Sequence, residues 1–232
     1  MDDIAPDLLE AIRKSFSEIV EGSSKIKQLY QLIQNGKATY ADAEEYAYCV
    51  GEALSQVFGR HLSSSALPDG RMYFNIADRV LRPLLEEDHA MVADAALQVQ
   101  TSLNRTAGIG IKAQTVPVND DRIYGIVNKV ANAENFDDIA WMLAEPVKNF
   151  SQAVVDDTLK ANVNFQGKAG LRPRIIRKSE SKCCEWCSQL AGEYDYPDVP
   201  DDVYRRHERC RCTVDYDPGS GKRQNVWTKQ YY

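Results

Sequence analysis

The stretch that decides how the end of this chain folds reads CCEWC at 183–187 and HERCRC at 207–212. Between Cys183 and Cys212 lie five of the six cysteines and one of the three histidines of the 232-residue chain. Before this stretch the only cysteine is Cys49. Because thiolate and imidazole are the ligands that zinc prefers, this concentration predicts a metal site.

Structural zinc sites take four ligands, supplied as two closely spaced pairs. One pair is Cys184-x-x-Cys187, because a two-residue gap lets one tight turn direct both sulfurs to one point. The other half begins at His207 and continues with Cys210 and Cys212. These are five candidates for four places, and the spacing does not choose between Cys210 and Cys212. Cys183 is left out because it would point away from a metal held by its neighbour.

The same residues could also form disulfides, remain free thiols or hold a catalytic metal. The acidic first residues do not form a secretory signal, so we expect a reducing cytoplasm, where clustered cysteines more often bind metal than pair. A catalytic zinc keeps an open position and needs a nearby acid or base. Residues 171–216 are also few for a lone hydrophobic core, and structural zinc contributes on the order of 10 kcal/mol to the folding of small peptides. We therefore favour a structural Zn²⁺.

Residues 1–165 show the three- and four-residue spacing of apolar side chains that is typical of amphipathic helices. The helices are expected around 8–33 with a break at Gly22, then from Thr39 to Phe58, from Tyr73 to Thr106 through Pro83, and in three shorter segments from Ile123 to Asn164. Residues 108–120 are expected to form a loop or short hairpin. Trp141 and Phe150 are interpreted as core aromatics, and His61 and His89 as surface or structural residues. The chain is thus predicted to be mainly α, with a helical N-terminal body.

The composition changes at 166–170, where two glycines indicate a linker. Residues 171–216 are expected to form a small α+β module stapled by zinc, with strands near 171–178, 193–196 and 213–216. A short helix capped by Asp201 or Asp202 is expected to carry His207. The residues from 217 to 232 have the composition of a flexible tail.

Charge divides the chain unevenly. The formal net charge is −6, made of −9 over residues 1–167, +2 over 168–213 and +1 over the end. This field is too weak to predict nucleic-acid binding by itself. The basic side chains near the cysteines are either a solvated face or contacts to DNA phosphates or an acidic protein surface; the candidates are Arg174, Arg177, Arg205, Arg206 and Arg211. No apolar run approaches the roughly 20 residues that cross a bilayer, so no membrane partner is expected.

The spacing of Cys184-x-x-Cys187, Leu190, Gly192 and His207-x-x-Cys210-Arg211-Cys212 resembles the C-terminal motif of the Mu F-like phage head morphogenesis family. The resemblance is specific over about residues 171–216, and Glu208 and Arg209 depart from the Pro and Asn of many relatives. It implies a bacteriophage minor capsid protein, a structural virion protein of the head that lies at the portal vertex and forms in the bacterial host cytoplasm. Its implied roles are head assembly and DNA packaging or ejection, with the portal protein, the major capsid or scaffold protein, and DNA as partners.

No paired carboxylate, serine or histidine arrangement in the helical body indicates catalysis, so the chain is predicted not to be an enzyme. Two rival hypotheses remain. The first is a DNA-binding protein with a zinc module, which predicts salt-dependent DNA affinity. The second is a metal-dependent nuclease, which predicts DNA nicking that is lost when His207 is changed.

Overall fold

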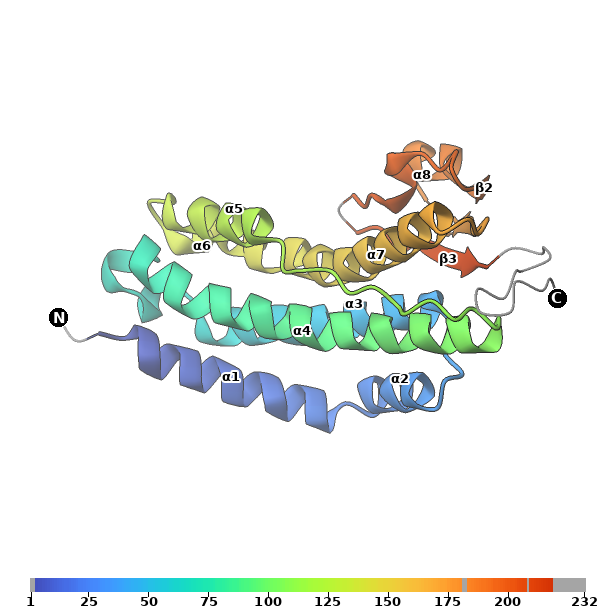
Figure 1. The fold of residues 1–232 in the computed structure, drawn as a ribbon. Coiled ribbons are helices and arrows are strands. Elements are labelled where there is room, and N and C mark those ends of the chain that lie inside the picture. The colour runs from blue at the N-terminus through green and yellow to red at the C-terminus, as the bar shows by residue number, and fades with distance from the viewer. Residues whose placement is uncertain (1–2, 181–182, 208, 219–232) are drawn as a thin grey trace.

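A computed structural model describes residues 3–180, 183–207 and 209–218. Long helices stack in an elongated body, and a small sheet lies over the end of the last long helix (Figure 1). The long elements are α1 (Ala5–Gly22), α2 (Ser24–Gln34), α3 (Tyr40–His61), α4 (Phe74–Thr106), α5 (Asp120–Ala131) and α7 (Glu145–Lys168). The short ones are α6 (Phe136–Ile139), α8 (Glu185–Gln189) and the 3₁₀ turns η1 (Ser64–Ala66), η2 (Pro68–Gly70), η3 (Ala140–Leu143) and η4 (Asp201–Tyr204). The mainly helical prediction is confirmed.

Local sequence explains where these helices begin and end. Ser23 breaks the first helical region and accepts a hydrogen bond from the backbone of Ile26, so that α2 starts anew. Thr39 caps α3 through a reciprocal pair of hydrogen bonds with Asp42, an arrangement that satisfies two otherwise unpaired backbone donors. Pro83, by contrast, is accommodated inside α4, which runs without interruption for 33 residues.

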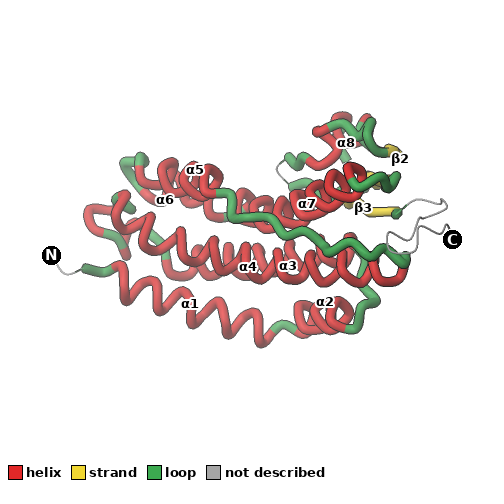
Figure 2. Tube along the Cα trace, viewed as in Figure 1, coloured by secondary structure: helices red, strands yellow, loops and turns green. Residues whose placement is uncertain are grey.

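The helix α3 is the centre of the body. It packs against α1, α2, α4 and α7, and it also touches β3. Its buried positions include Ala43, Ala47, Val50 and Leu54, as the sequence pattern predicts. Figure 2 shows the segment between α4 and α5 as loop along its length, so the loop interpretation is confirmed for residues 108–119 and the hairpin is not formed; Asp120 already begins α5.

The sheet is antiparallel with the order β2-β1-β3, made of β1 (Arg174–Lys178), β2 (Gly192–Asp195) and β3 (Thr213–Asp217). All three strands were predicted. The sheet is not a separate core, however, because Ile175, Val214 and Tyr216 belong to the same buried apolar cluster as the helical body. Residues 171–216 therefore gain stability from the body as well as from any metal.

Three sequence expectations need correction. The segment 166–170, expected to be a linker, is helical through Lys168. A glycine is required at position 167, because an added Cβ would lie only 2.3 Å from the Tyr196 ring. Trp141 is 54% exposed rather than part of the core, because it lies on the short turn η3. The helical turn expected to carry His207 is η4, which ends at Tyr204, so His207 lies beyond it. Of the expected tail, residues 219–232 lie outside the described part of the chain.

Candidate metal centre

Two loops bring the predicted ligands together. Cys184 is the N-cap of α8, and its sulfur accepts a hydrogen bond from the backbone N–H of Cys187 at 3.5 Å. This cap places both sulfurs of the Cys-x-x-Cys pair on the same side of the first turn. His207, Cys210 and Cys212 follow η4 and lead into β3. The cluster thus joins the connection between β1 and β2 to the segment that enters β3.

The distances fit a metal ion. His207 Nε2 lies 3.3 Å from Cys184 Sγ and 3.0 Å from Cys187 Sγ, and the sulfurs of Cys187 and Cys210 are 3.7 Å apart. In a tetrahedral zinc site, bond lengths of about 2.0 Å to nitrogen and 2.3 Å to sulfur put neighbouring ligand atoms roughly 3.5–3.8 Å apart. These three separations, all involving Cys187 or His207, therefore lie near the values that zinc requires.

The ligands fall into two overlapping groups. Cys184, Cys187 and His207 form one, and Cys187, Cys210 and Cys212 form the other; within each group all donor atoms lie within 4.8 Å of one another. Cys187 is common to both. The structure thus brings together all five predicted ligands, and it keeps both Cys210 and Cys212 within reach of the shared sulfur.

Burial differs across the cluster. Cys187, Cys210 and Cys212 are buried, whereas Cys184 is exposed. Burial raises the pKa of the Cys187 and Cys212 thiols, because an apolar surrounding disfavours the thiolate. The pKa of Cys184 is lowered by the hydrogen bond from the Cys187 backbone. Metal binding must displace the protons of the buried thiols, so the affinity will depend on pH.

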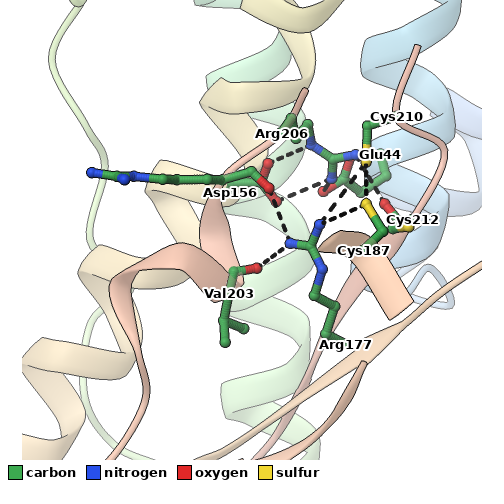
Figure 3. Close-up of polar contacts among 9 residues, drawn as sticks. Glu44, Asp156, Arg177, Cys187, Val203, Arg206, Cys210 and Cys212 are labelled. Carbon is green, nitrogen blue, oxygen red and sulfur yellow. Dashed lines mark hydrogen bonds and ion pairs between the residues drawn. The ribbon is translucent and has the colours of Figure 1, made fainter. Parts of the chain in front are cut away.

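A buried arginine contacts the sulfurs. Arg177, on the central strand β1, is 2% exposed and directs Nη2 toward Cys187 Sγ at 3.6 Å and Cys210 Sγ at 3.9 Å. Its Nη1 donates to the carbonyl oxygens of Val203 and Arg205, as Figure 3 shows for Val203. Its guanidinium also lies 5.5 Å from the centre of the Trp186 ring.

A second buried arginine connects the cluster to the helical body. Arg206 precedes His207, and its side chain is 2% exposed. It forms ion pairs with Glu44 of α3 and Asp156 of α7, and its Nη1 donates to the carbonyl oxygen of Cys212 at 2.9 Å (Figure 3). Although burial disfavours the charged guanidinium, the two carboxylates raise the pKa of Arg206.

Glu44 and Asp156 share this one cation. Burial raises the pKa of Glu44 well above its usual range; Arg206 opposes the shift, and the neighbouring carboxylate of Asp156 adds to it. The resulting network is buried on all sides. Removing its cation would leave acidic groups without compensation in an apolar interior.

The remaining predicted contact arginines also have partners within the chain. Arg174 pairs with Glu193 and Asp195. Arg211 pairs with Glu45 and stacks 3.7 Å from the centre of the Tyr48 ring. Arg205 pairs with Asp202, and its side chain is 71% exposed. Arg177 and Arg206 are thus buried in the interior, and the exposed guanidinium groups of the set are those of Arg174, Arg205 and, in part, Arg211.

Sequence reasoning missed the acidic partners of Arg206. A signal was present for Glu44, because it is a charged residue among the buried positions Tyr40, Ala43 and Ala47 of α3. Such a residue in an apolar stripe needs a buried partner. The apolar pattern of α3 does not identify Arg206 as that partner, because Arg206 lies far away along the chain.

Comparisons with protein-family models, curated proteins and solved structures find no match to this chain. Across the described residues, none of the helices combines the length and the apolar character that crossing a membrane requires. The cluster itself is therefore the main structural guide to function.

Proposed function

We propose that the chain holds a structural Zn²⁺ with four of the five ligands Cys184, Cys187, His207, Cys210 and Cys212. The observation that carries this proposal is the convergence of two sequence-distant loops on donor separations of 3.0–3.7 Å. A four-ligand protein site leaves no open position for a substrate or an activated water. The metal therefore stabilises the terminal sheet.

The biological setting that best fits this arrangement is that of a bacteriophage minor head protein at the portal vertex, acting in head assembly. The support is the spacing of residues 184–212, which resembles the Mu F-like family, together with a long helical body that offers extended surfaces for protein contacts. In this proposal the metal fixes the terminal module on the body, and the portal protein is the principal partner.

The deciding experiment is co-expression of the full chain with the portal protein and the major capsid protein of the phage or prophage from which it comes. We expect the chain to co-purify with assembled portal rings and to be present in few copies per mature head, as measured by quantitative mass spectrometry. Absence from both the rings and the heads would refute the assignment to the portal vertex. Metal analysis of the same preparation tests the zinc proposal separately.

A DNA-binding role is less well supported, because the arginines near the cluster are paired with carboxylates or buried. It predicts an affinity for duplex DNA that falls steeply with salt. A filter-binding titration between about 50 and 200 mM salt separates the two roles. Across this interval, a site with several phosphate contacts loses roughly 10³-fold or more of its DNA affinity.

A further inference from the structure

Arg177 lies beside two of the thiols of the proposed metal centre. It faces Cys187 Sγ at 3.6 Å and Cys210 Sγ at 3.9 Å, and both of these thiols are buried. Three thiolates, one neutral imidazole and one Zn²⁺ carry a net negative charge. A charge in a buried site is costly unless an opposite charge compensates it.

The fold holds the guanidinium in this position from several sides. Along β1 the burial alternates, so that Ile175 and Arg177 face inward while Arg174 faces outward. The cross-strand neighbour of Arg177 on β2 is Gly192, which has no side chain to crowd it. The carbonyl oxygens of Val203 and Arg205 accept from Nη1, and the Trp186 ring covers the group. Few rotamers are left to this side chain.

We infer that Arg177 is a positioning residue of the metal centre, which compensates the charge of the thiolates and so sets the affinity for the metal. This inference rests on the proposed metal site and adds to it a residue that is not a ligand. It also explains why an arginine occupies the buried face of a short strand, where an apolar residue would otherwise be expected.

The test measures metal affinity in the full chain. Co²⁺ binding is followed by the thiolate-to-cobalt absorption band, and Zn²⁺ affinity by competition with a chromophoric chelator. We expect Arg177→Met to weaken binding by about 10- to 100-fold, the loss that is usual when an outer-shell partner of a metal ligand is removed. Arg177→Lys keeps the charge without the planar fork, so its affinity should lie between those of Arg177→Met and the unsubstituted chain.

Arg174→Met is the matched control, because Arg174 lies on the same strand but on its outward face, paired with Glu193 and Asp195. Its metal affinity should equal that of the unsubstituted chain. Circular dichroism at saturating metal establishes that each variant is folded, and Arg177→Gln replaces Arg177→Met if the latter does not fold.

Two kinds of failure can be told apart. If the unsubstituted chain binds neither Co²⁺ nor Zn²⁺, the proposed metal site fails and the inference falls with it. If the chain binds metal but Arg177→Met binds as tightly as Arg174→Met, only the inference is overturned. It is also overturned if Arg177→Lys binds no more tightly than the neutral variant, or if neither neutral variant folds, because Arg177 would then act through packing and not through charge.

Discussion

Arg206 and Asp156 are 50 residues apart in sequence, yet Arg206 Nη2 donates to Asp156 Oδ1 at 3.1 Å in the buried interior. Arg206 adjoins the predicted ligand His207, whereas Asp156 lies in the middle of α7. Through this contact the loop that carries three of the five candidate metal ligands is fixed to the helical body. The position of the candidate metal centre is therefore set by the core as well as by its own side chains.

Arg206→Met should destabilise the protein by about 3–5 kcal/mol, because it leaves Glu44 and Asp156 buried without their shared cation. The matched control is Arg205→Met, one residue away, where an exposed side chain pairs with Asp202. This control should change the free energy of unfolding by less than about 1 kcal/mol. Urea denaturation of both variants at saturating zinc measures the difference, and equal effects would show that the buried ion pairs contribute no more than a surface pair.

Removal of the proposed metal should loosen the terminal sheet while leaving the long helices folded, because helical residues supply most of the shared buried core. Cys187→Ser, which removes the ligand common to both groups, should lower zinc affinity by more than about 100-fold, since the loss of an outer-shell partner alone costs 10- to 100-fold. Cys49→Ser on α3 is the control and should bind one zinc ion normally.

The same assay assigns the last ligand position. Of Cys210→Ser and Cys212→Ser, the variant that loses affinity identifies the fourth ligand, and the other should bind metal as the Cys49 control does. Hydrogen exchange measured with and without a chelator should show increased exchange in β1–β3 and little change in α3. Loss of protection throughout α3 would contradict a metal role confined to the terminal module.

The buried carboxyl of Asp88 should make stability depend on pH. Asp88 in α4 is 0% exposed, and the one side-chain donor seen at its oxygens is the hydroxyl of Ser151, at 2.9 Å from each. Burial raises the pKa of Asp88 to about 7, against the hydrogen bond from Ser151, which lowers it. Folding therefore favours the protonated form.

The cost of burying Asp88 grows as pH rises. Below the unfolded-state pKa, near 3.9, Asp88 is protonated in both states and costs nothing. As pH rises toward 7, the unfolded state ionises while the folded state does not, so stability falls; above 7 the cost is fully present, at most roughly 4 kcal/mol for a shift of about three pKa units. Asp88→Asn should therefore stabilise the protein at pH 8 and change little at pH 4, as measured by urea denaturation. An equal loss of stability at both values would refute the prediction.

Gly51 permits the close crossing of α3 and α7. A Cβ at this position would lie 2.4 Å from Ser151 Oγ and 3.0 Å from the backbone Cα of Lys148. Gly51→Ala should therefore destabilise the protein by about 1–3 kcal/mol through overpacking. Gly59→Ala, on the same helix, has open space around the new methyl group and should stabilise by about 0.5–1 kcal/mol. Thermal denaturation compares the two, and a neutral Gly51→Ala would show that the helices can separate at no cost.

Much of the architecture follows from local patterns. Periodic apolar residues predict the long helices, the Thr39 cap predicts the start of α3, and β-branched residues flanked by arginines predict β1. The short segments 193–196 and 213–216 were also predicted as strands. The Cys-x-x-Cys and His-x-x-Cys spacings predict the ligand set, because each pair is formed within one turn. Trp141 was misplaced, because an aromatic residue between helices carries no sign of the face on which it lies.

The sequence alone determined the helical class of the body, the strands and the residues able to hold a metal, since these depend on spacing within a few residues. Only the tertiary structure decided which charges are internal. Arg174 and Arg177 look alike in a short basic strand, yet one pairs at the surface and the other faces buried sulfurs. Arg206 forms ion pairs with residues of α3 and α7 because packing of the helices brings carboxylates that are distant in sequence to one point. No local sequence pattern encodes these long-range contacts.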